Sequence, residues 1–366
     1  MRAEAIFPAG VARLSAPVSV RPCGDPERAL LAQASGLAAD GLDAVRVGTH
    51  MDERQVQEAT AATVAIVSDL GLSATSASVL HNSNKLALRI APCDTFARVA
   101  EARDRQWAAF EVELARRLAA TVAPVAALEP RVASHVHLRD GFVVTLWTYY
   151  EVEGESHATG GLLRGGPESG LVPGEYAHAL VQLHAGMLQV EMVTPQWTDR
   201  VAEARALVGS SHRTPELPEA DRRFLAGTLD SLARRIGDRD APTQLLHGEP
   251  HRGNVLRTKG GLVFVDLETC CRGPVEFDLA YVPDEVVALY PDANAELLHE
   301  CRALMLAMVA AWRWDEDDRF PNRDRYREPL LAELREACGL LPHCARRSRE
   351  AGSSRVSWAE RGKGSP

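Results

Sequence analysis

The stretch from Leu245 to Glu268 constrains the fold more than any other part of the chain. It begins with two apolar residues, gathers polar side chains within eight positions, and passes through a Gly-Gly turn into an apolar run that ends in an acid. Short apolar runs bounded by glycine are typical of strands. The stretch therefore predicts two short strands with chemistry at their rim. The eight positions contain His247, Glu249, His251 and Asn254, and the acid near the end of the apolar run is Asp266.

The spacing of Glu249, Asn254 and Asp266 fits a phosphoryl-transfer site. In such a site a carboxylate accepts the proton of the substrate hydroxyl, while an Asn five residues later and an Asp on the next strand hold Mg²⁺. Asn254 and Asp266 offer hard oxygen ligands, one neutral and one anionic, which suit a Mg²⁺ ion bridging phosphates. An isolated Asn in a loop is most often a turn former. Its spacing from Glu249 favours the metal role here.

Composition excludes several classes of protein. The chain has 366 residues, 46% of them hydrophobic and 25% charged, which is enough for two lobes with a core. A net charge of −9 argues against a nucleic-acid partner. The longest apolar run in a helical context, residues 303–312, is too short to span a bilayer. The seven cysteines include no C-x-x-C pair, so we expect thiols in a reducing cytoplasm. The sequence leaves the oligomeric state open.

The order of the predicted elements divides the chain into five parts. We expect a poorly ordered leader at 1–50, with Met51 as an alternative start, an N-terminal nucleotide-binding lobe at 51–150, a glycine-rich connector at 151–174, a helical catalytic lobe at 175–345 and a disordered tail at 346–366. The expected strands of the first lobe are 77–80, 86–90, 95–99, 132–138 and 142–149, and its expected helices are 51–71 and 103–119. The expected helices of the second lobe are 176–187, 199–208, 219–236, 284–289, 296–312 and 327–338.

This order, together with several motifs, resembles a known family. HGEPHRGN at 247–254 and FVDLE at 264–268 follow Leu183-His184 and precede GPVEFDLA at 273–280. These motifs are similar to those of aminoglycoside phosphotransferases and their choline-kinase relatives, and the resemblance covers about Met51 to Cys338. It implies an α+β protein kinase-like bilobal fold, with a small antiparallel-sheet N-lobe and a mostly helical C-lobe. It also implies transfer of the γ-phosphate of ATP or GTP to a hydroxyl of a small molecule.

The resemblance assigns the catalytic roles. Glu249 would be the base, although the family usually has Asp there. Glutamate keeps the charge but carries its carboxylate one methylene further, and a displacement of about 1 Å can cost about 100-fold in rate. Positioning and charge dominate phosphoryl transfer, so a glutamate can still work. The alternative is a nucleotide-binding pseudokinase with a regulatory or scaffolding role. His251 would hydrogen-bond the transferred group, and His247 would be structural.

The resemblance also predicts a nucleotide site in the N-lobe. Arg98, on the third strand, would take the place of the kinase lysine that binds the α- and β-phosphates, and Glu111 would be its ion-pair partner. An arginine fork suits phosphate oxygens, so the role survives the change. Lys85 is the second candidate for phosphate contact. Ser83 and Asn84, at the tip of the first hairpin, would present backbone N–H groups.

Three further predictions concern the edges of the site. Residues 148–151 would form the hinge that meets the adenine, and Glu268 would either help a second metal ion or face solvent. Asp284, Glu285 and the acidic run 315–318 could recognise a polyamine-like acceptor, but a solvated face is the favoured interpretation of the run.

Overall fold

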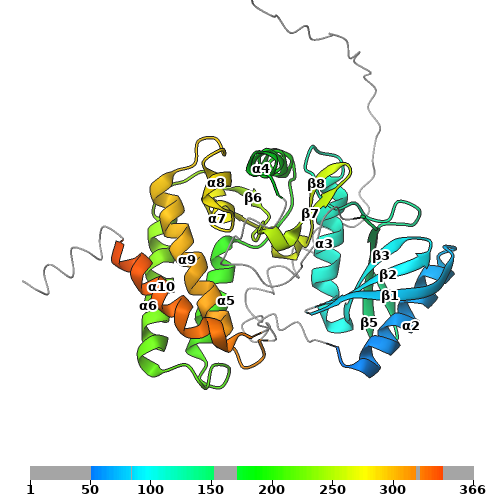
Figure 1. Cartoon of the computed structure of the whole chain (residues 1–366), viewed down its shortest axis with the longest axis horizontal. Coiled ribbons are helices and arrows are strands. Elements are labelled where there is room, and N and C mark those ends of the chain that lie inside the picture. Colours follow the sequence, from blue (N-terminus) through cyan, green and yellow to red (C-terminus); the bar gives the residue numbers. More distant parts are fainter. Residues whose placement is uncertain (1–50, 84, 152–170, 319–321, 341–366) are drawn as a thin grey trace, which may run out of the picture. The chain divides into compact units, whose positions relative to one another are not determined.

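The computed structural model describes residues 51–83, 85–151, 171–318 and 322–340 (Figure 1). The predicted leader, most of the predicted connector, the predicted tail and Asn84 lie outside these residues. The five-part division of the chain therefore stays a prediction.

The N-terminal part forms a five-stranded antiparallel sheet in the order β1-β2-β3-β5-β4. Its elements are α2 (Glu53–Asp69), β1 (Ala74–Asn82), β2 (Leu86–Pro92), β3 (Thr95–Glu101), α3 (Arg105–Leu118), β4 (His137–Arg139) and β5 (Phe142–Thr148). Side chains on β2 and β3 alternate between buried and half-buried, as strands with one core face do. Helix α2 packs on that face and begins at a capping box, in which Asp52 and Gln55 satisfy each other's backbone N–H groups.

One predicted strand of this part is wrong. Residues 132–136 form no strand, and only His137–Arg139 pairs with β5. Arg131, the residue directly before this segment, is anchored through its side chain. Arg131 donates to the carboxylate of Glu129 and to the carbonyl of Cys93 at 2.8 Å. Apolar alternation predicted a strand because it cannot register such local ion pairs.

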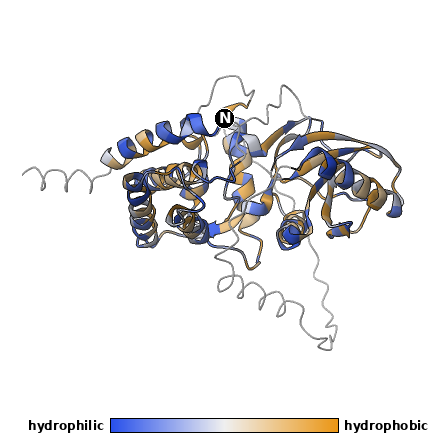
Figure 2. Cartoon of the chain, turned by 90° about the horizontal axis from the view of Figure 1, so that it is seen from below, coloured by the Kyte–Doolittle hydropathy of each residue, from blue (hydrophilic) through white to orange (hydrophobic). Residues whose placement is uncertain are grey.

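The C-terminal part is mostly helical. Its helices are α4 (Pro173–Met187), α5 (Trp197–Gly209), α6 (Glu219–Gly237), α7 (Val275–Leu279), α8 (Asp284–Val287), α9 (Ala295–Arg313) and α10 (Asp324–Leu340). The α9 helix is buried along most of its length and packs with α5, α6 and α10 (Figure 1). Figure 2 shows helices that carry hydrophobic and hydrophilic residues side by side, as amphipathic elements around a core do. None of the described helices has the length and apolarity that a bilayer span needs.

Two small strand pairs interrupt the helices. Strands β7 (Val255–Thr258) and β8 (Gly261–Phe264) form the predicted hairpin, while β6 (Gln244–Leu246) pairs with β9 (Cys271–Gly273). The sequence did not predict β9 or the five-residue helix α7, because both are too short to show a period. The prediction of an antiparallel N-lobe followed by a helical C-lobe is confirmed, since the described part has the bilobal kinase-like layout.

Candidate active site

The loop between β6 and β7 has a backbone held from several sides. Gly248 has φ +87°, and a Cβ at this position would lie 2.0 Å from the carbonyl oxygen of Thr269, so only glycine fits. The buried carboxylate of Asp278 accepts hydrogen bonds from the backbone N–H of His247 at 2.9 Å and of Gly248 at 2.7 Å. The ring of His247 is buried, and its Nε2 lies 2.9 Å from the carbonyl oxygen of Val265. This loop has little freedom to shift.

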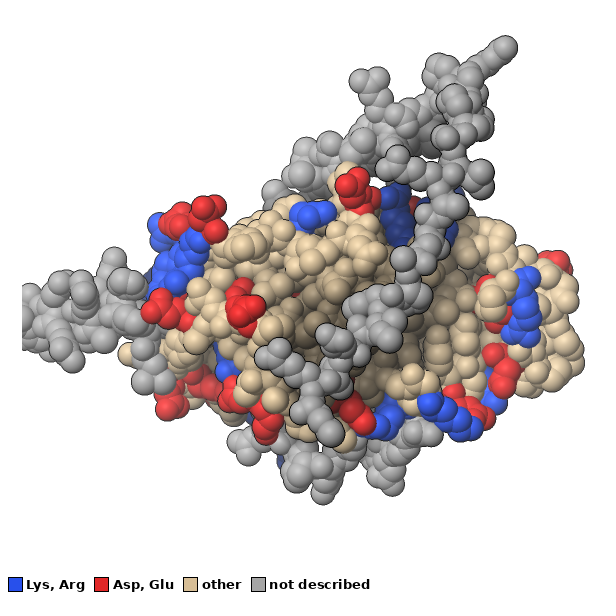
Figure 3. Space-filling view, turned by 90° about the horizontal axis from the view of Figure 1, so that it is seen from above, with Lys and Arg blue, Asp and Glu red and all other residues tan. Residues whose placement is uncertain are grey.

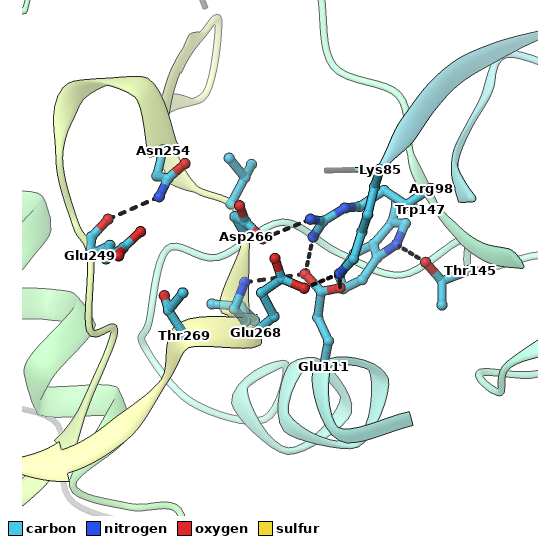
Figure 4. A network of polar contacts seen from close by, with 12 residues as sticks. Lys85, Arg98, Glu111, Thr145, Trp147, Glu249, Asn254, Asp266, Glu268 and Thr269 are labelled. Carbon is cyan, nitrogen blue, oxygen red and sulfur yellow. Dashed lines mark hydrogen bonds and ion pairs between the residues drawn. The ribbon is translucent and has the colours of Figure 1, made fainter. Parts of the chain in front are cut away.

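Glu249, His251 and Asn254 project from this loop. The amide nitrogen of Asn254 donates to the backbone carbonyl of Glu249 at 2.9 Å, which ties the two ends of the loop together (Figure 4). Burial lowers the pKa of His251 and favours the neutral ring at pH 7. Its Nδ1 accepts from the N–H of Gly253 at 3.0 Å, so the proton of the neutral ring is on Nε2. His251 can therefore donate a hydrogen bond.

The carboxylate of Glu249 has a partner that the sequence did not predict. Arg200, on α5, donates from Nη2 to Oε1 of Glu249. Arg200 is 9% exposed, and its guanidinium carbon lies 5.4 Å from the ring centroid of Trp312. Burial disfavours the charged form of Arg200, but Glu249 outweighs that effect and the pKa of Arg200 is raised. No motif marks Arg200 among the 41 basic residues of the chain.

Arg98 links the N-lobe to the segment after β8. From β3 it donates through Nη1 to Glu111 on α3 and through Nη2 to Oδ1 of Asp266 at 2.7 Å (Figure 4). The backbone N–H of Leu267 also donates to Glu111, at 3.1 Å. The structure thus brings together the three residues predicted as phosphate binder, helix partner and metal ligand. Glu113, the competing candidate on α3, faces Arg116 and Arg117 of its own helix instead.

Lys85, which directly precedes β2, joins the same network. Its Nζ pairs with Glu268 and lies 3.7 Å from Oε2 of Glu111. Ser83 donates from its backbone N–H to the carbonyl of Lys85 at 3.3 Å, while Asn84 lies outside the described residues. Lys85 therefore connects the end of the β1–β2 hairpin to Glu268, in the segment after β8.

Asp266 is held as an anion in an unusual backbone conformation. Its φ and ψ of 68° and 62° lie in the left-handed region, which non-glycine residues adopt when their surroundings enforce it. Burial would raise the pKa of its carboxyl, but the charges of Arg98 and Lys85 outweigh burial and hold the pKa well below its usual range. Asp266 is therefore ionised at neutral pH.

The donor set of Asn254 and Asp266 fits Mg²⁺. The hydrogen bond from Asn254 to Glu249 uses the amide nitrogen, so the carbonyl oxygen is the side-chain atom suited to a metal. Asp266 supplies a carboxylate. The described residues contain no group of three His, Cys, Asp or Glu side chains arranged as a metal site. That is compatible with Mg²⁺, which is usually bound through one or two protein ligands, water and substrate phosphates.

The acidic run predicted as a solvated face is partly buried. Asp315 is 6% exposed and pairs with Arg213 at 2.6 Å, while Asp318 lies 2.9 Å from Arg313. The interpretation as a solvated face fails for these two residues, because arginines from outside the run neutralise them.

The chain is similar to known phosphotransferases and kinases. Residues 71–300 match the model of the APH phosphotransferase enzyme family. No curated protein sequence matches the chain. Amicoumacin kinase hAmiN is 12% identical with a TM-score of 0.58, over 80% of this chain and 98% of that chain. A choline/ethanolamine kinase family protein from Mesorhizobium loti is 17% identical with a TM-score of 0.53, over 80% and 97%. Choline kinase LicA from Streptococcus pneumoniae is 14% identical with a TM-score of 0.54, over 75% and 96%. At these identities the structural likeness establishes the fold.

Proposed function

We propose that this chain, which belongs to the APH phosphotransferase enzyme family, transfers the γ-phosphate of ATP or GTP to a hydroxyl of a small molecule. A phosphotransferase acting on small molecules is the activity common to the family. The nucleotide, the hydroxyl acceptor and the residue roles below are our proposal. The cysteine usage of the chain supports a cytoplasmic location for this reaction.

The observation that carries the proposal is the double ion pair of Arg98. One guanidinium contacts Glu111 on α3 and Asp266 after β8, two carboxylates that are far apart in sequence. In kinase-like sites, a strand cation paired with a helix glutamate must stand beside the metal-binding Asp for phosphoryl transfer. Arg98 would then bind the α- and β-phosphates, with Lys85 and the backbone near Ser83 close to the same phosphates.

Nucleotide-bound neighbours support the co-substrate. Amicoumacin kinase was solved with AMP-PNP and Ca²⁺, and an aminoglycoside 2'-phosphotransferase, at a TM-score of 0.51, with GDP. We therefore assign ATP or GTP to the site around Arg98 and Asp266. Asn254 and Asp266 would hold the Mg²⁺ ion, which supplies charge neutralisation at the phosphates when bound.

Glu249 would act on the acceptor hydroxyl, and His251 would act on the transferred phosphoryl group. The acceptor hydroxyl would lose its proton to Oε2 of Glu249 as its oxygen forms a bond to the γ-phosphorus. The bond from that phosphorus to the bridging oxygen breaks, and the nucleoside diphosphate leaves with the bridging oxygen. His251 would donate from Nε2 to a non-bridging phosphoryl oxygen, where negative charge must be stabilised.

The acceptor is a small hydroxylated molecule. Asp315 and Asp318 already have arginine partners, so these two acids do not argue for a polycation. The face drawn in Figure 3 likewise shows acidic and basic residues side by side rather than a field of one sign. Hydroxylated compounds of different charge therefore belong in the first screen.

Two measurements test the proposal. A thermal shift with Mg-ATP and with Mg-GTP should raise the unfolding temperature of the wild type. Phosphate transfer should then be measured across a panel of hydroxylated metabolites. The Asp266→Ala variant should lose transfer, whereas Asp230→Asn, on the exposed face of α6, should keep it. A wild-type protein that binds nucleotide but transfers phosphate to no acceptor would refute the proposed enzymatic activity.

The second candidate is a nucleotide-binding pseudokinase. The observation that favours it is the ion pair between Glu249, which stands where the family usually has Asp, and Arg200. Glu249→Asp separates the two candidates. An inactive wild type that gains transfer in this variant would support the pseudokinase, whereas an active wild type excludes it.

A further inference from the structure

Glutamate in place of aspartate at the base position raises a geometric problem. The extra methylene moves the carboxylate outward by a distance on the order of 1 Å, and it adds a rotatable bond. A backbone shift away from the acceptor would restore the distance between the carboxylate and the acceptor hydroxyl, but the loop cannot make such a shift. Gly248 is pressed against Thr269, and Asp278 holds two successive backbone N–H groups of the loop. The carboxylate must therefore be positioned through the side chain.

Arg200 is the group placed to do this. It lies on α5, a different element from the loop, and donates to Oε1 of Glu249. Arg200 as a whole is 9% exposed and its guanidinium lies over Trp312, so the arginine itself has little rotational freedom. Its second terminal nitrogen, Nη1, is buried and has no hydrogen-bond partner in the described part of the chain. Glu249 is therefore the carboxylate that this buried cation depends on.

A second arginine that interacts electrostatically with Glu249 has a carboxylate partner of its own. Arg313, at the end of α9, is within electrostatic range of Glu249, but its Nη1 lies 2.9 Å from Asp318. The side chain of Glu249 is 21% exposed, compared with 11% for Arg200. The pair thus has a buried, fixed end and a more open end. With Oε1 engaged by Arg200, Oε2 is the oxygen left to accept a proton.

We propose that Arg200 is a positioning residue that holds the longer Glu249 side chain where a catalytic base is needed. This inference rests on the proposed function, because it gives Glu249 the role of base. A fixed guanidinium fork is well suited to the task, since arginine presents its donors in a rigid plane. On this view Arg200 and Glu249 act as one unit that replaces the usual aspartate.

The test compares five proteins: wild type, Arg200→Gln, Arg200→Lys, Glu249→Asp and the control Arg205→Gln. Arg205 is also on α5, but it makes an exposed ion pair with Asp230 at 3.1 Å, away from the loop. Each protein is assayed with Mg-nucleotide and the best acceptor of the panel. Hydrolysis, with water as the acceptor, is measured in parallel. The unfolding temperature and the KM for nucleotide are recorded for each variant.

A positioning role predicts a specific pattern. Arg200→Gln should lower kcat by about 100-fold while the KM for nucleotide stays within about twofold, because the phosphate-binding residues are untouched. Arg200→Lys should recover part of the rate, since it keeps the charge without the fork. Glu249→Asp should also lose rate, because its carboxylate no longer reaches Arg200. Arg205→Gln should behave as wild type.

A double variant separates positioning from folding. In the Glu249→Gln background, adding Arg200→Gln should change kcat little, because the residue on which Arg200 acts is already disabled. A merely structural Arg200 would lower the unfolding temperature and the folded fraction with kcat per folded molecule unchanged.

The outcomes are distinguishable. An active wild type whose Arg200→Gln variant is equally or more active overturns the inference and leaves the proposed function intact. A gain in rate for Glu249→Asp also overturns the inference, because the pocket would then not be built around glutamate. A wild type that binds Mg-nucleotide but transfers phosphate to no acceptor, water included, overturns the proposed function and this inference with it.

Discussion

The bridge made by Arg98 yields a prediction about stability that needs no substrate. Arg98→Met keeps an apolar stem of similar length but removes the cation between Glu111 and Asp266. Removing one partner of a buried ion pair costs about 3–5 kcal/mol, because the other charge stays buried without compensation. For Arg98→Met the expected loss in the free energy of unfolding is about 3 kcal/mol, at the lower end of this range, for two structural reasons.

The first reason concerns Glu111, whose side chain is 2% exposed. It keeps Lys85 at 3.7 Å and the N–H of Leu267 at 3.1 Å, so it is not left without partners. The second concerns Asp266, whose side chain is 32% exposed and can be solvated by water when Arg98 is gone. Both features reduce the penalty of the lost cation.

Urea unfolding followed by far-ultraviolet circular dichroism measures this loss. With a slope of about 3 kcal/mol per molar urea, the midpoint should fall by about 1 M. The double variant Arg98→Met/Glu111→Gln is the matched control. It removes both charges of the buried pair and should regain much of the midpoint.

Two results would contradict the reasoning. An unchanged midpoint for Arg98→Met would mean that the guanidinium does not compensate Glu111 in the folded protein. A double variant less stable than Arg98→Met would mean that Glu111 is stabilised by its other neighbours alone.

Three further predictions concern the loop between β6 and β7 and its neighbours. Gly248→Ala should destabilise the fold by more than Gly71→Ala in thermal unfolding, because both glycines have positive φ but only Gly248 would meet a backbone atom at 2.0 Å; equal losses would rule out the clash. Asp278→Ala should cost about 2–5 kcal/mol in urea unfolding, since it orphans two buried backbone N–H groups, and a loss below about 1 kcal/mol would contradict this role. The pKa of Asp266 is lower in the folded protein than in the unfolded chain. The ionised carboxylate therefore stabilises the fold fully at pH values above the unfolded pKa, and this stabilisation is lost as the pH falls towards the folded pKa. Wild type should therefore lose more stability than Asp266→Asn between about pH 5 and pH 2, and parallel curves would count against the shift.

Much of the candidate site could be predicted from local sequence because its parts lie close together in the chain. Glu249, His251 and Asn254 occupy one loop, and their spacing alone places them on the same rim. Likewise, the placement of Arg98 on a strand and Glu111 on the following helix required only the local period of each segment. The roles of these residues stay predictions.

Other features depended on contacts between distant segments. Glu111 and Glu113 are equally plausible in sequence, and only the orientation of α3 directs Glu111 to Arg98 and leaves Glu113 to its own helix. The incorrect strand at 132–136 also reflects a contact between distant segments. Arg131 is held by Glu129 and by the carbonyl of Cys93, which lies in the turn between β2 and β3.

By itself, the sequence determined the kinase-like order of elements and the identity of the metal and base candidates, because periodicity and spacing are local properties. Only the tertiary structure decided which charges compensate which. Arg98 meets Asp266 across 168 residues, and Arg200 meets Glu249 across 49. Burial makes each cation require a counter-charge, but the chain must fold before that partner is defined.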